Sequence, residues 1–317
     1  MNTNTPQWFK DSIANNPEIC SVKVKGTKIV YNTWGDKKNP GLIFVHGGMA
    51  HAEWWNFIGP YFAKTHRVIA MNLGGMGESD WKKKYSIESW GDEIVGVCKK
   101  EKLKKPILVG HSLGGMCSVI AASSMKKTLY GLVIVDTAIM PPSEKPPKFD
   151  LKIRANKIYK KQSDIRKRFR LVPSQSDALD YVMDYIAEKS IKKVRGGWTW
   201  KFDPNYMKIF NSDSFAERQA MYRNKLKGLK CRVAIFRGEK SLLFPGRSAK
   251  YMHELMDKKS PIINIPEAHH HIMVDQPLAL VAALRSLVID WDHSKPSKAS
   301  LLYTSDAADE EDSVELG

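Results

Sequence analysis

Short apolar runs recur along the chain and alternate with longer amphipathic segments. Before the first run, residues 21–34 alternate polar and apolar positions around a glycine, which predicts a β-hairpin. The apolar runs are rich in β-branched residues and predict buried strands at 41–47, 67–72, 106–110, 132–136, 231–238 and 261–265. The amphipathic segments predict helices at 54–64, 86–101, 112–127, 246–257 and 277–291. This alternation indicates an α/β fold with a mostly parallel, doubly wound sheet.

The alternation stops after the sixth predicted strand. Prolines at 141, 142, 146 and 147 end regular structure there, and the chain is then charged and helical in pattern to about residue 230. We therefore expect a mainly helical lid at 141–230, inserted into a core formed by 1–140 and 231–293. Such a lid would cover the carboxyl edge of the sheet, which is where open α/β sheets bind their ligands.

The last residues have a different character from the rest of the chain. The stretch SLLYTSDAADE (300–310) has the form of a translated sequencing adaptor. We expect residues 299–317 to be adaptor-derived and disordered, and we leave them out of the fold prediction.

Composition and charge restrict the possible partners. The 317 residues are 43% hydrophobic and 26% charged, with a formal net charge of +16. The lysines are spread along the chain without a nucleic-acid motif, so we expect a solvated basic surface and no nucleic-acid partner. No apolar run approaches the roughly 20 residues of a membrane span, and the chain start lacks the pattern of a secretory signal. Four widely spaced cysteines favour a reduced, cytoplasmic location and no metal site. The oligomeric state stays open.

The strongest chemical signal is the segment Gly110-His111-Ser112-Leu113-Gly114-Gly115. It lies directly between a predicted strand and a predicted helix, which is the setting of a G-x-S-x-G nucleophile elbow. In such a tight turn the serine occupies a strained backbone conformation between glycines, and its hydroxyl projects above the sheet. The pattern therefore predicts Ser112 as a nucleophile. The alternative is a serine that only caps its helix.

The order of motifs resembles the α/β-hydrolase superfamily. HGG, GGMGES, GHSLGG, a lid and PEAHHHIMVDQP follow one another, and the resemblance covers nearly the whole chain up to about residue 292. Within the superfamily the chain is similar to lidded, single-domain bacterial serine hydrolases of the esterase type, in which a phrase like GGWTWKFDP (196–204) lies late in the lid. The resemblance implies hydrolysis of an ester or a similarly activated carbonyl, without metal or organic cofactor. It does not name the small-molecule substrate.

The resemblance also implies where the oxyanion of the reaction would be held. His46-Gly47-Gly48-Met49 ends an early buried strand, at the place where this family keeps its oxyanion loop. Two backbone N–H groups must point at the developing negative charge. We expect Leu113 to supply one of them and Gly48 the other. The glycines could also serve only to make the turn.

The base and the acid follow from family order. His269 matches the position of the catalytic histidine, after the last strand, and its neighbour His270 is an outside alternative. The usual place of the acid reads Gly-Glu-Lys-Ser-Leu-Leu (238–243) and has no aspartate. The family's second solution puts the acid at the end of the preceding strand, where Asp136 stands. We therefore expect Asp136 ahead of Glu239 to orient the histidine.

Several functions share these residues. A lactonase, a thioesterase and a carbon–carbon bond hydrolase would use the same triad as an esterase. A hydrolase fold that binds a small ligand without catalysis is a further alternative, because the acid is missing from its usual place. Nucleic-acid binding through the basic lid would show steeply salt-dependent association.

Overall fold

The computed structural model describes residues 5–144, 156–212, 215–256 and 258–294. The predicted adaptor-derived tail, 299–317, lies outside the described residues. The chain divides into two compact units, residues 1–277 and residues 278–317. Helix α10 (Pro277–His293) forms the described part of the second unit and agrees with the helix predicted at 277–291. All other elements below belong to the first unit.

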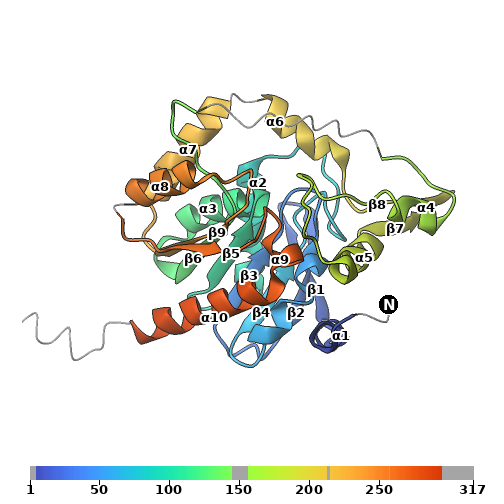
Figure 1. Cartoon of the computed structure of the whole chain (residues 1–317), viewed down its shortest axis with the longest axis horizontal. Coiled ribbons are helices and arrows are strands. Elements are labelled where there is room, and N and C mark those ends of the chain that lie inside the picture. The colour runs from blue at the N-terminus through green and yellow to red at the C-terminus, as the bar shows by residue number, and fades with distance from the viewer. Residues whose placement is uncertain (1–4, 145–155, 213–214, 257, 295–317) are drawn as a thin grey trace, which may run out of the picture. The chain divides into compact units, whose positions relative to one another are not determined.

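Within the described residues, eight strands form one sheet in the order β1-β2-β4-β3-β5-β6-β9-β10 (Figure 1). Strands β1 and β2 form an antiparallel hairpin, β2 pairs antiparallel with β4, and the remaining neighbours are parallel. This confirms the predicted α/β fold with a mostly parallel sheet. The strands are β1 (Glu18–Val24), β2 (Thr27–Trp34), β3 (Gly41–Val45), β4 (Arg67–Met71), β5 (Ile107–His111), β6 (Gly131–Val135), β9 (Arg232–Gly238) and β10 (Ile262–Ile265).

Short 3-10 helices replace one of the predicted helices. The amphipathic segment 54–64 forms η1 and η2, and Pro60 stands in the first turn of η2. Helix α1 was not expected from the sequence. The helical elements outside the 141–230 segment are α1 (Gln7–Ala14), η1 (Ala52–Trp55), η2 (Gly59–Phe62), α2 (Ile87–Lys100), α3 (Leu113–Met125), η3 (Lys126–Thr128), α8 (Gly246–Leu255) and α9 (Ile272–Asp275).

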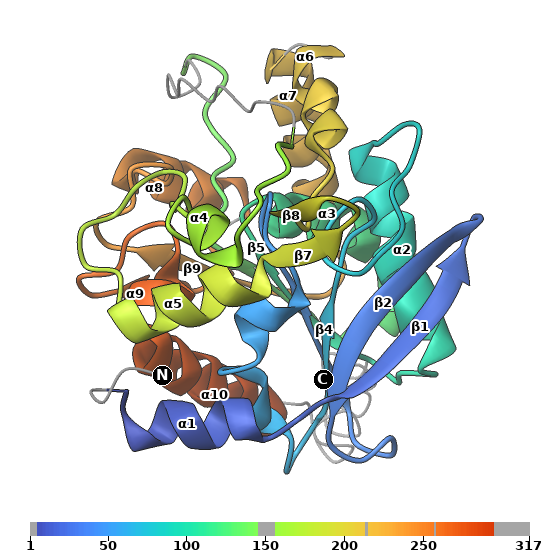
Figure 2. The same cartoon turned by 90° about the vertical axis from the view of Figure 1, so that its right-hand side faces the viewer.

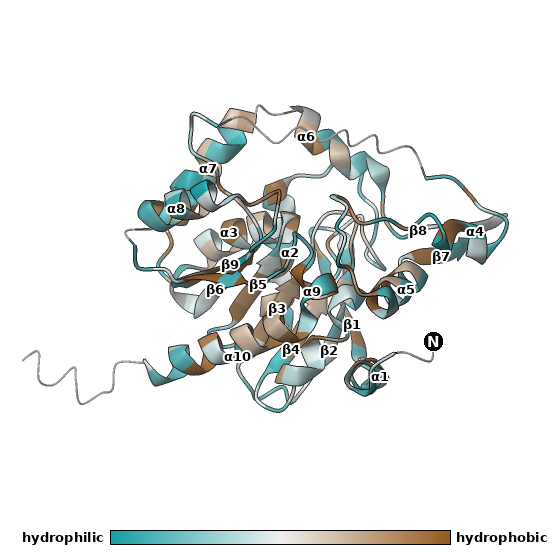
Figure 3. Ribbon diagram, viewed as in Figure 1, coloured by the Kyte–Doolittle hydropathy of each residue, from teal (hydrophilic) through white to brown (hydrophobic). Residues whose placement is uncertain are grey.

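The core lies between the central strands and the helices that pack on them. Every residue of β3, β4, β5 and β6 is buried, as expected for parallel strands covered on both faces. Helix α3 packs on β5 and β6 and also against α2 and α7, so it has no broad solvent face and is apolar almost throughout. Figure 3 shows the hydrophobic central strands beside the more polar helix α8.

Residues 141–230, called the insertion below, connect β6 to β9. Figures 1 and 2 show its helices α6 and α7 beyond the upper edge of the sheet. The sequence analysis expected no strands here, but the structure has a small β7–β8 hairpin with glycines 196 and 197 at its turn. That the insertion acts as a lid stays a prediction. Its elements are α4 (Gln162–Arg166), α5 (Asp180–Lys189), β7 (Ile191–Val194), β8 (Gly197–Trp200), η4 (Pro204–Lys208), α6 (Ile209–Ser212) and α7 (Phe215–Lys227).

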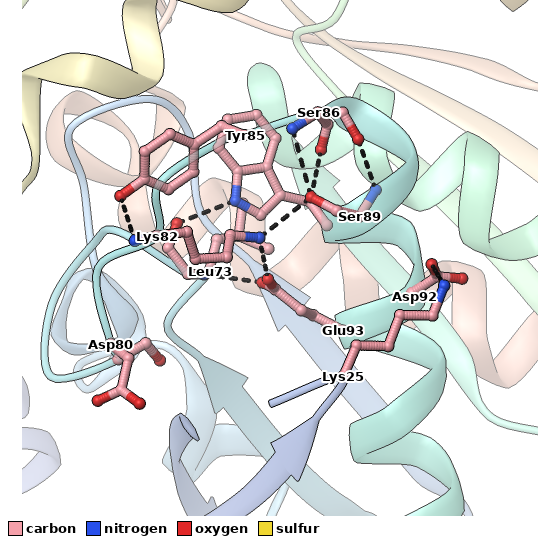
Figure 4. Close-up of polar contacts among 12 residues, drawn as sticks. Lys25, Leu73, Asp80, Lys82, Tyr85, Ser86, Ser89, Asp92 and Glu93 are labelled. Carbon is pink, nitrogen blue, oxygen red and sulfur yellow. Dashed lines mark hydrogen bonds and ion pairs between the residues drawn. The ribbon is translucent and has the colours of Figure 1, made fainter. Parts of the chain in front are cut away.

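A buried ion pair fixes the loop between β4 and α2 (Figure 4). The Glu93 carboxylate, on α2, accepts a hydrogen bond from the backbone N–H of Gly74 at 2.7 Å and pairs with the Lys82 ammonium. Their side chains are 3% and 12% exposed. Burial raises the pKa of Glu93, and the Lys82 charge opposes that effect. The Trp90 indole N–H donates to the Gly74 carbonyl at 2.9 Å, so both ends of this loop are tied to one helix.

The start of the same loop is held by Asn72. Its amide oxygen accepts from the Ala52 N–H at 2.8 Å, and its amide nitrogen donates to the Val30 carbonyl at 3.0 Å. An aspartate could not make the second bond, because an ionised carboxylate only accepts. Among the described residues, no helix has both the length and the apolar character needed to cross a membrane.

Substituting Lys82→Met should destabilise the protein strongly, because it leaves the Glu93 carboxylate buried without its cation. We expect a loss of about 3–5 kcal/mol in the free energy of unfolding, measured by urea denaturation. The exposed pair Lys25–Asp92, with side chains 77% and 41% exposed, supplies the matched control. Lys25→Met should cost less than about 1 kcal/mol. Similar losses for the two variants would contradict the prediction.

Candidate active site

Ser112 lies in the sharp turn between β5 and α3. Its φ of +53° and ψ of −120° are a conformation that residues with a side chain rarely adopt. The turn packs so closely on β3 that a β-carbon on Gly114 would lie 2.4 Å from the carbonyl oxygens of Val45 and His46. Glycine is therefore required at 114. The Thr137 hydroxyl donates to the Ser112 carbonyl at 3.0 Å and helps to hold the strained residue in place.

The structure brings three side chains from three strand ends into one hydrogen-bonded line. His270 Nε2 lies 3.1 Å from Ser112 Oγ, and His270 Nδ1 lies 2.7 Å from Asp136 Oδ2. Ser112 follows β5, Asp136 follows β6, and His270 lies in the loop after β10. A carboxylate can only accept, so Nδ1 carries the proton and Nε2 is free to accept from the serine hydroxyl.

His269, the predicted base, does not reach Ser112. Its backbone N–H donates to Asp275 Oδ2 at 2.7 Å, and its Nδ1 lies 3.1 Å from the same oxygen. The prediction for the histidine is therefore off by one residue, because His270, and not His269, lies beside Ser112. Side chains of consecutive loop residues point in different directions, and this loop turns through Glu267 at a φ of +60°. Within the described part of the chain, no group of three or more His, Cys, Asp or Glu side chains is arranged to hold a metal ion.

Asp136 stands where the sequence analysis placed it, and the protein satisfies its carboxylate almost completely. The side chain is 1% exposed. Oδ1 accepts from the Gly238 N–H at 2.9 Å, and Oδ2 accepts from the Ser241 hydroxyl at 2.5 Å as well as from His270. These donors satisfy a carboxylate that is shielded from solvent. Ser241 was not singled out from the sequence, and its position in the Gly-Glu-Lys-Ser loop was the available signal.

Glu239, the alternative acid, does not contact a histidine side chain. Its side chain is exposed, and Oε2 accepts a hydrogen bond from the Glu267 N–H at 3.0 Å. Glu267 pairs in turn with Lys240. Glu239 therefore braces the turn that leads into the histidine loop.

Gly48 and Leu113 line the same cavity as Ser112. This cavity has a volume of about 280 Å³. Among the described residues, neither backbone N–H donates to a protein acceptor, so both are available to a bound molecule. Leu113 is the first residue of α3, where the helix dipole favours negative charge. The apolar residues of the cavity wall are Met49, Trp54, Met116, Val172, Met207, Phe210 and Leu243.

The insertion forms one side of this cavity through Val172, Tyr206, Met207 and Phe210. A second cavity of about 230 Å³ shares Gly48, Met49, Trp54, Val172 and His271 with the first. Its wall adds the aromatic residues Phe169, Trp200 and Phe202 of the insertion. The cavity beside Ser112 therefore adjoins a second one, which is lined by aromatic side chains together with Arg168 and Arg170.

Gln175 ties the insertion to the histidine loop. Its amide oxygen accepts from the His271 backbone N–H at 3.1 Å, and its amide nitrogen donates to Asp275 Oδ2 at 3.1 Å. The Asp275 carboxylate thus accepts hydrogen bonds from both His269 and Gln175. Burial raises the pKa of Asp275, while the bonds from His269 oppose this rise. Neither residue was identified from the sequence, because the contact joins segments about a hundred residues apart.

Four histidines around the site are buried and neutral. Burial lowers the pKa of His46 to about 4, and it lowers the pKa of His51, His111 and His271 well below the usual value. His111 Nε2 lies 2.9 Å from the His270 carbonyl and helps to place that residue. The two rings that lie beside His270, those of His111 and His271, therefore carry no charge near neutral pH.

Comparison with known proteins shows the family and the fold of the chain. The sequence model of the family described as alpha/beta hydrolase fold matches residues 40–277. An esterase of Mycobacterium tuberculosis is 22% identical over 288 residues, which cover 86% of this chain and 89% of the esterase. Two solved structures share the fold. A thioesterase domain from the curacin biosynthetic pathway has a TM-score of 0.70 at 21% identity and covers 85% of this chain and 99% of its own. E-2-(acetamidomethylene)succinate hydrolase has a TM-score of 0.71 at 18% identity, with coverages of 86% and 99%.

Acidification should destabilise the fold through the buried histidines. An unfolded histidine has a pKa of about 6.5, so below that pH the unfolded chain binds protons that the folded chain does not. The free energy of unfolding should therefore fall from pH 7 to pH 5.5, by up to about 1.4 kcal/mol per pH unit for each such histidine. Urea midpoints at several pH values measure this slope. His51→Gln should make it shallower, and a flat profile in the parent would contradict the prediction.

Proposed function

Because the chain belongs to the α/β-hydrolase family, we propose that it hydrolyses a carboxylic ester or a similarly activated carbonyl through Ser112, His270 and Asp136. One observation carries the proposal: His270 bridges the serine hydroxyl and the aspartate carboxylate with one ring nitrogen on each. An esterase relative that spans nearly the whole chain supports the same reaction class. The proposed partner is a small-molecule substrate, and the chemistry requires neither metal nor organic cofactor.

In the first step, His270 Nε2 accepts the hydroxyl proton of Ser112 while Oγ bonds to the substrate carbonyl carbon. The carbonyl π electrons move to oxygen, and the resulting anion is held by the N–H groups of Gly48 and Leu113. The carbonyl then re-forms, the alcohol leaves, and Nε2–H donates the proton to it. The serine ester is hydrolysed by water in the reverse sequence, with Nε2 again accepting and returning one proton.

Asp136 has two tasks in this mechanism. It selects the tautomer in which Nδ1 carries the proton, and it stabilises the imidazolium that forms after proton transfer. Its bonds from Gly238 and Ser241 hold the carboxylate in one orientation, so the imidazole is oriented as well. Pre-organised geometry of this kind lowers the cost of reaching the transition state.

The cavity walls favour a small apolar group beside the scissile carbonyl. The space next to Ser112 is about 280 Å³ and is lined mostly by methionine, leucine, valine and aromatic side chains. A thioester, a lactone or an activated carbon–carbon bond presents the same carbonyl chemistry to the same residues. The non-catalytic alternative arose from an acid missing at its usual place. The contact between Asp136 and His270 supplies that acid and favours catalysis.

Intact-mass labelling with a fluorophosphonate probe tests the nucleophile and the base. The parent should gain one adduct, and Ser112→Ala should gain none. His270→Ala should label at least about 10³-fold more slowly, because the hydroxyl loses its base. His269→Ala is the matched control from the adjacent position and should label within about threefold of the parent. Labelling that depends on His269 and not on His270 would overturn the assignment. No adduct on the folded parent would overturn the proposed function itself.

The acid is tested by two amide substitutions of similar size. Asp136→Asn should reduce kcat for p-nitrophenyl esters by about 10³- to 10⁴-fold, since an amide can hold the wrong imidazole tautomer. Glu239→Gln should keep kcat within about threefold, because the hydrogen bond that its carboxylate makes among the described residues is to the Glu267 backbone N–H and not to a histidine. Steady-state kinetics at saturating ester decides between them. A larger loss for Glu239→Gln would make Glu239 the acid.

A further inference from the structure

Tyr206, in the insertion, lies against the oxyanion loop. Its side chain is 2% exposed and lines the cavity that holds Ser112. A β-carbon on Gly48 would lie 2.8 Å from Tyr206 Oη, so the phenol closely approaches the residue next to the expected oxyanion. Glycine at 48 is what permits this approach.

The surrounding structure holds the tyrosine ring in place. The backbone N–H of Tyr206 donates to the Asp203 carbonyl at 3.2 Å, and the ring packs edge-on against Trp90 at 6.1 Å between centroids. Asp203 is anchored in turn, because its carboxylate accepts from Tyr85 Oη at 2.7 Å and its N–H donates to Gly75 at 2.8 Å. The position of the phenol is therefore fixed by contacts with the β4–α2 loop and with Trp90.

The phenol itself has no protein partner among the described residues. It approaches Gly48 closely, and the cavity that it lines also holds Ser112 and His270. Burial raises the pKa of Tyr206 far above neutrality, so the group keeps its proton and remains a donor. A phenol O–H at the cavity wall that donates to no described protein acceptor is available to a molecule bound in the cavity.

We propose that Tyr206 Oη–H donates a third hydrogen bond to the substrate carbonyl oxygen, beside the N–H groups of Gly48 and Leu113. This inference rests on the proposed function. The phenol keeps its proton throughout, and the bond strengthens as negative charge develops on the oxygen. The leaving group is served by His270, whereas Tyr206 contacts the loop of Gly48. The insertion thereby contributes a catalytic residue, and not only a wall, to the site.

Tyr206→Phe tests the proposal because it removes only the hydroxyl. We expect kcat for p-nitrophenyl butyrate to fall about 30- to 300-fold while KM changes by less than about threefold, since the bond strengthens in the transition state. The loss should be the same factor for aryl esters whose leaving-group pKa values differ. Affinity for a trifluoromethyl ketone, which forms an oxyanion on Ser112, should fall by a similar factor. Affinity for the corresponding alcohol should not change.

Tyr222→Phe is the matched control. This second buried phenol, on α7, also has no hydrogen-bond partner within the described part of the chain, but it does not line the Ser112 cavity. Tyr222→Phe should keep kcat within about threefold. If Tyr206→Phe does not fold by circular dichroism, Gly48→Ala replaces it, because the new methyl group would displace the phenol and should lower kcat at least about tenfold.

Two results would overturn the proposal. One is an unchanged kcat in the folded Tyr206→Phe protein, or in Gly48→Ala where that variant replaces it. The other is a loss that grows with leaving-group pKa, which would assign the phenol to the departing oxygen. Fluorophosphonate labelling of the parent separates this failure from that of the proposed function. A labelled parent with an unaffected Tyr206→Phe rejects only the role of Tyr206, whereas an unlabelled parent rejects the hydrolase mechanism.

Discussion

The Asp136 carboxylate is the interaction on which the arrangement of the site depends. It receives hydrogen bonds from Gly238 at the end of β9, from Ser241 in the following loop and from His270 in the histidine loop. Two segments that are distant from Asp136 in sequence, the end of β9 with its following loop and the histidine loop, are thereby held to one buried charge. Such a charge must be paired with several donors to be tolerated in the interior. The same requirement that stabilises Asp136 also aims His270 at Ser112.

The insertion is joined to this centre by polar contacts from two sides. Gln175 bonds to the backbone of His271 and to Asp275, so it holds the histidine loop from outside. Asp203 bonds to Tyr85 and Gly75 of the β4–α2 loop, which the Lys82–Glu93 pair keeps in place. The cavity wall therefore depends on buried hydrogen bonds as well as on apolar packing. Gln175 thus links the insertion to the loop that carries His270, and Tyr206 links it to Gly48.

Most of the fold was predictable because short runs of neighbouring residues already show which segments are buried. Continuous β-branched runs such as 41–45 and 131–135 indicated central parallel strands, and the order of strands and helices implied the doubly wound sheet. The β7–β8 hairpin was missed because its strands are only four residues long and one carries two lysines. Helix α1 was also missed. Short elements with mixed burial take their form from neighbours that are far away in sequence.

The sequence by itself predicted Ser112, the loop of Gly48 and Asp136, with Glu239 as the alternative acid, because the first three directly follow strands with a clear apolar pattern. It predicted His269 as the base, with His270 as the alternative, from a run of three consecutive histidines. Only the tertiary structure decided which of the three faces Ser112. The three histidines have identical side chains, so the sequence does not show in which direction each one points. In the structure each has its own partner: His269 contacts Asp275, His270 contacts Asp136, and His271 contacts Gln175. The approach of Tyr206 to Gly48 was likewise decided only in three dimensions, since about 158 residues separate them in the chain and only folding sets such distant contacts.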